Sequence, residues 1–366
     1  MTRVIFHVGP PKSGTSAIQK WLSSNHDLLL DYGIYYPTHD CDTNGVSSGN
    51  LQSIYDVNRD GDIELSSLKV AQLKSHCQTL HCKTLLLSSE YFFQHISELA
   101  NHFPTAKFLA YLRFPLEVAE SSYNQGIKRH GEVRALGLPQ EPRTYQLEVL
   151  DGLINKLGGQ RFLLRPYHKQ CFVDENLLSD FVSAVEPSLL EDKNLNLPRE
   201  FVNTSYSLEA LELKRWLNQF TLGALQQPID HFLQRYKQGT LEYSVIPPAQ
   251  FQKYKSSFVE KLSAFCLKNN VHNSEVFINA CMETKQKPYI KQQIDNDRFI
   301  DVFIAMLNAN PELGIAMQDM FSKKNSFEGI RRYPERIALI QDAFSISMRV
   351  SYFQHRVKRR LFGTTV

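Results

Sequence analysis

Long hydrophobic runs are missing from this sequence, and their absence excludes a membrane-spanning protein. None of the 366 residues lie in an apolar stretch that approaches the roughly 20 residues of a transmembrane helix. A strand-like run already occupies residues 4–8, which leaves no space for the charged and apolar regions of a secretion signal. We therefore expect a cytoplasmic protein.

The sequence also has little excess of one charge sign and few cysteines. The formal net charge is only +3, which gives no reason to expect a nucleic-acid partner. Six cysteines in a chain of this length do not make a disulfide scaffold, so we expect reduced thiols. The dipeptides His76-Cys77 and His81-Cys82 lack the usual spacing of zinc ligands, and we interpret them as a helix-to-strand turn. No metal site is predicted.

Short apolar runs alternate with helical patterns in the first half of the chain. This alternation predicts an α/β fold of the P-loop type, with a mainly parallel sheet flanked by helices. The predicted strands cover residues 4–8, 84–88, 107–112 and 162–164, and the predicted helices cover 15–22, 96–101, 116–128, 145–157 and 176–185.

Beyond Pro198 only helical periodicity is found. The predicted helices there cover residues 208–220, 251–267, 299–307 and 337–353. We predict an α/β nucleotide-binding core at 1–198 and, at 199–366, a helical extension that completes the core and shapes the acceptor site.

The stretch GPPKSGTS, Gly9 to Ser16, looks like a phosphate-binding loop with a displaced lysine. In a nucleoside triphosphatase loop a lysine directly follows the second glycine and reaches the β- and γ-phosphates. Here Thr15 takes that place, and Lys12 stands two residues before Gly14. The loop therefore predicts a different phosphate ligand.

The backbone N–H donors of the loop narrow the choice of ligand. Pro10 and Pro11 carry no N–H, so the amides of residues 12–16 are the ones that can converge on an anion at the start of a helix. The hydroxyls of Thr15 and Ser16 would add hydrogen bonds. Such a cradle suits one phosphate better than a triphosphate tail, with Lys12 on its far side.

The hexapeptide P-K-S-G-T-S resembles the 5′-phosphosulfate loop of sulfotransferases, which use 3′-phosphoadenosine 5′-phosphosulfate (PAPS). The resemblance implies that the loop binds PAPS and that Lys12 stabilises the leaving phosphate oxygen. The loop residues concerned are Pro11, Lys12, Ser13, Gly14, Thr15 and Ser16.

A second segment, KFLAYLRFPLEVAESSYNQGIKR, is similar to the 3′-phosphate segment of the same family. Arg113 ends a predicted strand, Pro115 follows, and Ser121 stands eight residues after the arginine. The resemblance implies that Arg113 and Ser121 bind the 3′-phosphate, for which a guanidinium fork with a nearby hydroxyl is suited. The chain lacks the family's R-K-G-x-x-G segment, so the resemblance implies no further contacts to this phosphate.

Two weaker matches extend the resemblance to about residue 220. Residues 161–185 are similar to the part that closes the adenine side, where Arg165 and Tyr167 would flank the purine. Residues 195–218 look like a segment of bacterial sulfotransferases that act on carbohydrates. The implied reaction is transfer of the sulfuryl group of PAPS to a hydroxyl or amine of an acceptor, with a carbohydrate, polysaccharide or glycolipid as the expected class, and without a metal.

The general base has two candidates. Glu90 follows the strand at 84–88, and parallel strands direct their carboxyl ends toward the ligand. In the resembled family a His or an acidic residue near this place takes the acceptor proton. The alternatives are that Glu90 merely caps the next helix, or that His39, in a loop after Pro37, is the base.

Two other functions remain open from the sequence. One is a protein that binds PAPS or its bisphosphate product without catalysis, and the other is a P-loop kinase for a small metabolite. The basic run at residues 356–362 suggests contact with an acidic polymer or a membrane surface, although such runs are more often solvated helix ends. The sequence does not indicate an oligomeric state.

Overall fold

A computed structural model describes residues 2–39, 49–58, 62–198, 206–322, 333 and 335–343. Contacts divide the chain into two compact units that interleave along the sequence. The first comprises residues 1–118, 139–201 and 252–284, and the second comprises 119–138, 202–251 and 285–366. The predicted division of function between 1–198 and 199–366 stays a prediction.

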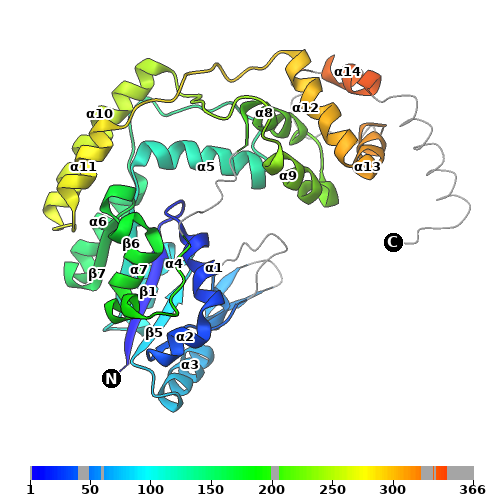
Figure 1. Cartoon of the computed structure of the whole chain (residues 1–366). Coiled ribbons are helices and arrows are strands. Elements are labelled where there is room, and N and C mark those ends of the chain that lie inside the picture. The colour runs from blue at the N-terminus through cyan, green and yellow to red at the C-terminus, as the bar shows by residue number, and fades with distance from the viewer. Residues whose placement is uncertain are drawn as a thin grey trace, which may run out of the picture. The chain divides into compact units, whose positions relative to one another are not determined.

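A five-stranded sheet forms the centre of the first unit (Figure 1). Its order is β2-β5-β1-β6-β7, and every neighbouring pair is parallel. The strands are β1 (Arg3–Gly9), β2 (Ile34–Tyr35), β5 (Thr84–Ser88), β6 (Lys107–Leu112) and β7 (Phe162–Pro166). The predicted α/β class and the predominantly parallel sheet are confirmed.

Helices cover both faces of this sheet because its strands are apolar on both sides. Ile5 and Tyr111 share one cluster with side chains of α1 and α7. On the other face, Phe6 meets Phe92 of α4 edge to face at 5.3 Å between ring centroids. The helices of this unit are α1 (Thr15–Ser24), α2 (His26–Asp31), α3 (Ser67–Thr79), α4 (Phe92–His102), α6 (Tyr145–Leu157), α7 (Leu177–Val185) and α11 (Ser274–Glu283).

A small hairpin was not expected from the sequence. Strands β3 (Tyr55–Val57) and β4 (Ile63–Leu65) pair antiparallel and lead into α3. His76-Cys77 lies in the last turn of α3 and His81-Cys82 lies between α3 and β5, so the two dipeptides surround a helix-to-strand turn. Within the described ranges no three metal-ligating side chains gather, and the five cysteines there are free thiols.

The second unit is helical, as the sequence predicts for this part of the chain. It contains α8 (Leu208–Leu217), α9 (Gln226–Arg235), α12 (Asn296–Ala309), α13 (Pro311–Ser322) and α14 (Glu335–Ala343). Helices α5 (Pro115–Arg129) and α10 (Pro248–Lys268) each run from one unit into the other. Beyond residue 206, Ser244 and Tyr289 form an isolated β-bridge.

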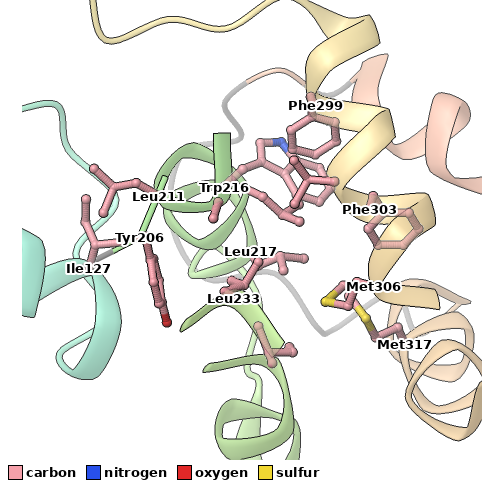
Figure 2. Close-up of a cluster of buried hydrophobic side chains, with 14 of the residues drawn as sticks. Ile127, Tyr206, Leu211, Trp216, Leu217, Leu233, Phe299, Phe303, Met306 and Met317 are labelled. Carbon is pink, nitrogen blue, oxygen red and sulfur yellow. The ribbon is translucent and has the colours of Figure 1, made fainter. Parts of the chain in front are cut away.

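The core of the second unit forms around Trp216, which packs on Phe299 at 5.3 Å between ring centroids (Figure 2). Leu217 and Phe303 in the same cluster are fully buried. Helix α8 also buries its charged side chains, and these are paired: Arg215 and Glu212 bond to each other, 2.9 Å from Nε to Oε1. A helix buried on all sides explains why its sequence lacks a clear polar face.

No helix in the described ranges combines the length and the apolar character needed to cross a bilayer.

Candidate functional site

Three neighbouring strands of the first unit end at one edge of the sheet, and each leads to a predicted site residue. Strand β1 is central and runs into the loop that contains Lys12. Its neighbours are β5, which leads to Glu90, and β6, which leads to Arg113. The parallel arrangement therefore brings the loop, a carboxylate and a guanidinium to the same edge, where open α/β sheets bind their ligands.

The loop has the backbone of an anion-binding nest. The φ angles of Lys12 and Gly14 are +72° and +81°, whereas that of the intervening Ser13 is not positive. Alternation of this kind turns successive N–H groups toward one concave side. In the part of the chain that the structure describes, no acceptor meets the amides of residues 13–16. These amides are thus available to an anion at the start of α1.

Gly14 is required for close packing as well as for its φ angle. A Cβ at this position would lie 2.5 Å from a methyl group of Leu177 and 2.8 Å from the ring of Tyr167. Any side chain at residue 14 would push the loop off these neighbours. The glycine therefore lets the first turn of α1 pack against Tyr167, which follows β7, and against Leu177 of α7.

Thr15 has the strongest local mark of a ligand site. Its side chain is 1% exposed, and its hydroxyl oxygen has no hydrogen-bond partner among the described residues. A buried hydroxyl without a partner is costly and rare in folded proteins. By contrast, the Ser13 hydroxyl donates to the carbonyl oxygen of Pro10 at 2.5 Å and so belongs to the loop itself.

Arg113 holds the loop from the β6 side. Its Nη1 donates to the Lys12 carbonyl oxygen at 2.8 Å, and its Nε donates to Glu117 at 3.0 Å. The guanidinium also lies over the Tyr167 ring, 5.2 Å from the centroid. A second support comes from Gln146, whose amide donates to the Pro11 carbonyl oxygen at 3.1 Å.

The pKa of the Lys12 ammonium is lowered overall, mainly because the side chain is largely buried. Burial lowers its pKa, the carboxylate of Glu90 raises it, and the nearby Arg113 lowers it. The Glu90 carboxylate is therefore close enough to this lysine for its charge to act on it. No N–H of α4 donates to the Glu90 carboxylate in the described residues, and the residue at the N-cap is Tyr91. Capping of α4 therefore does not occupy this carboxylate.

The other predicted residues lie in different surroundings. The Tyr36 hydroxyl and His39 Nε2 are 2.8 Å apart, in the segment after the edge strand β2. Arg165 directs Nε and Nη2 at the carboxylate of Asp180, both at 2.6 Å. Ser121 lies on α5, in the part that belongs to the second unit, and its role at the 3′-phosphate stays a prediction.

Several predictions lie outside the described residues. They concern the basic run at 356–362, the last part of the helix expected at 337–353 and part of the carbohydrate-sulfotransferase-like segment at 195–218. Three side chains near the site were not anticipated: Glu117, Gln146 and Asn50. The pairing of Glu117 with Arg113 could have been predicted, because Glu117 stands one helical turn after Arg113. The other two are brought to the site by folding alone.

Comparisons with known proteins leave the family open. No family model matches the chain, and no curated protein matches it. Among solved structures, a crystal structure of retinol dehydratase in complex with androsterone and inactive cofactor PAP aligns with 92% of this chain and 84% of that chain. The identity is 15% and the TM-score is 0.14. A similarity this low supports no conclusion about fold or function.

Proposed function

We propose that this protein is a sulfotransferase that moves the sulfuryl group of PAPS to a hydroxyl or amine of an acceptor. The observation that carries the proposal is the loop: a buried, unpartnered Thr15 hydroxyl and open amides at the start of α1, with Lys12 inside the loop. A triphosphatase would need its lysine after Gly14. The sequence motifs at Lys12 and Arg113 point to PAPS in particular.

Each residue of the site has a role in this reaction. The amides of the loop and the hydroxyls of Thr15 and Ser16 would hold the 5′-phosphate, while Arg113 and Ser121 would bind the 3′-phosphate. Tyr167, which packs against Gly14 and Arg113, would border the nucleotide in this proposal. Arg165 is less suited to border the purine, because two of its nitrogens are engaged by Asp180.

The chemistry balances without a metal. The acceptor oxygen or nitrogen forms a bond to sulfur, and the bond from sulfur to the bridging oxygen breaks. The electron pair of that bond stays on the 5′-phosphate, where Lys12 neutralises the growing charge. Glu90 takes the acceptor proton. Its strand β5 is the direct neighbour of β1, whereas His39 follows β2, one strand further out.

The experiment that tests the function is a calorimetric titration with PAPS, the 3′,5′-bisphosphate product and ATP with Mg²⁺. We expect binding of the first two and a clear loss of affinity when the 3′-phosphate is removed. Tight binding of ATP with Mg²⁺ and indifference to the 3′-phosphate would favour a small-molecule kinase. Binding of PAPS without transfer to any member of a saccharide panel would favour a non-catalytic binding protein.

The acceptor class is proposed from the sequence motif alone. Residues 195–218 resemble carbohydrate sulfotransferases of bacteria, so a saccharide, free or in a polysaccharide or glycolipid, is the first class to test. A saccharide panel with labelled PAPS would identify the acceptor through the labelled product. We propose a cytoplasmic location, with peripheral membrane contact through residues 356–362 to be examined by vesicle sedimentation.

A further inference from the structure

The chain makes an unusually close approach at residues Gly49 and Asn50, which return to the sheet at the end of β5. Gly49 has a φ of +72°, and a Cβ there would lie 1.8 Å from the carbonyl oxygen of Ser88. No side chain can be tolerated at this distance. Both residues are buried, although nothing in the local sequence marks them as part of the core.

At this point Asn50 makes hydrogen bonds of the kind that a neighbouring strand would otherwise make. Its backbone N–H donates to the Ser88 carbonyl oxygen at 3.1 Å, and its Oδ1 accepts from the Ser88 N–H at 2.8 Å. The side-chain Nδ2 donates to the Pro37 carbonyl oxygen at 3.3 Å. One asparagine thus joins the ends of β2 and β5 after their backbone ladder has stopped.

Every polar atom of Ser88 is held. Besides the two bonds to Asn50, the Ser88 carbonyl oxygen accepts from Gln19 Nε2 at 3.4 Å, and the Ser88 hydroxyl pairs with His7 Nδ1 at 2.8 Å. The next residue, Ser89, is fully buried and donates its N–H to the His7 carbonyl oxygen at 3.1 Å. Glu90 follows directly, so its backbone leaves from an immobilised dipeptide.

We propose that Asn50, seated by Gly49, is a positioning residue that fixes Glu90 beside Lys12. The inference rests on the proposed function, in which Glu90 is the base and Lys12 meets the leaving oxygen. A misplacement on the order of 1 Å can cost about 10²-fold in rate, so such a restraint has a direct use. Asn50 directs its hydrogen bonds at Ser88 and Pro37 and therefore acts on Glu90 through the backbone of Ser88 and Ser89.

The test measures the Glu90–Lys12 interaction itself and needs no acceptor. Lysine labelled with ¹³C at Cε is titrated by NMR, and the Lys12 signal is assigned with Lys12→Met. Glu90 and Arg113 are charged groups of the described residues that act on this ammonium. Glu90→Gln should lower the Lys12 pKa because it removes the negative charge. Asn50→Ala should lower it in the same direction, and the double variant should add little to Glu90→Gln.

Two further variants keep the test decisive. Gly49→Ala displaces Asn50 through the Ser88 carbonyl and should lower the Lys12 pKa as Asn50→Ala does. Asn101→Ala removes the same kind of side chain from the exposed end of α4 and should change nothing. Circular dichroism and thermal melting confirm that each variant is folded before its Lys12 signal is compared.

The outcomes separate this inference from the function on which it rests. The positioning role would be overturned by an unchanged Lys12 titration in folded Asn50→Ala. It would also be overturned if Asn50→Ala had the same effect in the wild type and in the Glu90→Gln background. If the titration shows the coupling but calorimetry finds no PAPS binding, the proposed function fails, and with it the catalytic purpose of the restraint. Coupling together with PAPS binding supports both.

Discussion

Arg113 donates its Nη1 to the backbone carbonyl oxygen of Lys12 at 2.8 Å, so the end of β6 is tied to the loop that follows β1. The guanidinium therefore combines two tasks in the proposed function. It shapes the loop that receives one phosphate, and its other N–H groups would serve the phosphate that the sequence motif assigns to it.

Replacement of Arg113 distinguishes these two tasks. Arg113→Ala should weaken PAPS by about 10–100-fold, the value of one lost charge-assisted hydrogen-bond pair. Adenosine 5′-phosphosulfate lacks the 3′-phosphate and should lose much less. Calorimetry with both ligands gives the comparison. Equal losses would mean that Arg113 serves only to hold the loop through Lys12.

Lys12→Ala should act mainly on turnover. If Lys12 meets charge that appears only on the departing oxygen, its loss should lower turnover by about 10²–10³-fold, as for one preorganised oxyanion donor. The affinity for PAPS should fall far less. Release of the bisphosphate is the rate to follow, with and without EDTA. A reaction that EDTA abolishes and Mg²⁺ restores would contradict the metal-free mechanism.

Glu90→Gln and His39→Asn should be compared side by side for PAPS binding and turnover. We expect Glu90→Gln to bind PAPS and to lose turnover by about 10²-fold or more, the usual contribution of a general base. His39→Asn should keep most activity, because His39 lies after the outer strand β2 and pairs with Tyr36. The reverse pattern would transfer the role of base to His39.

Thr15→Val should leave the free protein as stable as before, or raise its free energy of unfolding by roughly 1 kcal/mol. The reason is that the substitution removes a buried hydroxyl without a partner and keeps the shape. The affinity for the bisphosphate product should nevertheless fall. Ser13→Ala provides the contrast, since it breaks the bond to Pro10 and should destabilise the free protein. Loss of stability in Thr15→Val would show that this hydroxyl has an internal role.

His7 should make the protein sensitive to acid. Complete burial lowers its pKa from 6.5 to about 3, so the folded state binds this proton less readily than the unfolded state. The contribution of the neutral His7 to the free energy of unfolding is complete above pH 6.5 and is lost as the pH falls toward 3. At pH 5.5 the loss should be about 1.4 kcal/mol.

The measurement is urea unfolding at pH 7.5 and pH 5.5 for the wild type and His7→Gln. The variant should lack this part of the pH dependence, whereas His102→Gln, at the exposed end of α4, should retain it. An identical pH dependence in the wild type and His7→Gln would show that His7 is protonated without cost in the folded protein.

Local sequence determined the elements that carry the site. The strand at Lys107–Leu112 and the helix at Tyr145–Leu157 have the predicted bounds, because an apolar run and a 3.6-residue period are local signals. Helix α3 was not predicted, because only Val70, Leu73 and Cys77 are buried along its length and the apolar periodicity is therefore weak. The hairpin of β3 and β4 was not predicted either, because strands of three residues have too few positions to display alternation.

Only the tertiary structure decided which chain segments meet. The order of strands along the chain does not reveal that β1 lies between β5 and β6, and this order is what brings Glu90 and Arg113 to the two sides of the Lys12 loop. Packing likewise decides that Asn50 bonds to Ser88 and that Arg165 bonds to Asp180. Sequence periodicity reports which face of an element is buried, whereas the partner of a buried polar group is fixed only when the elements pack.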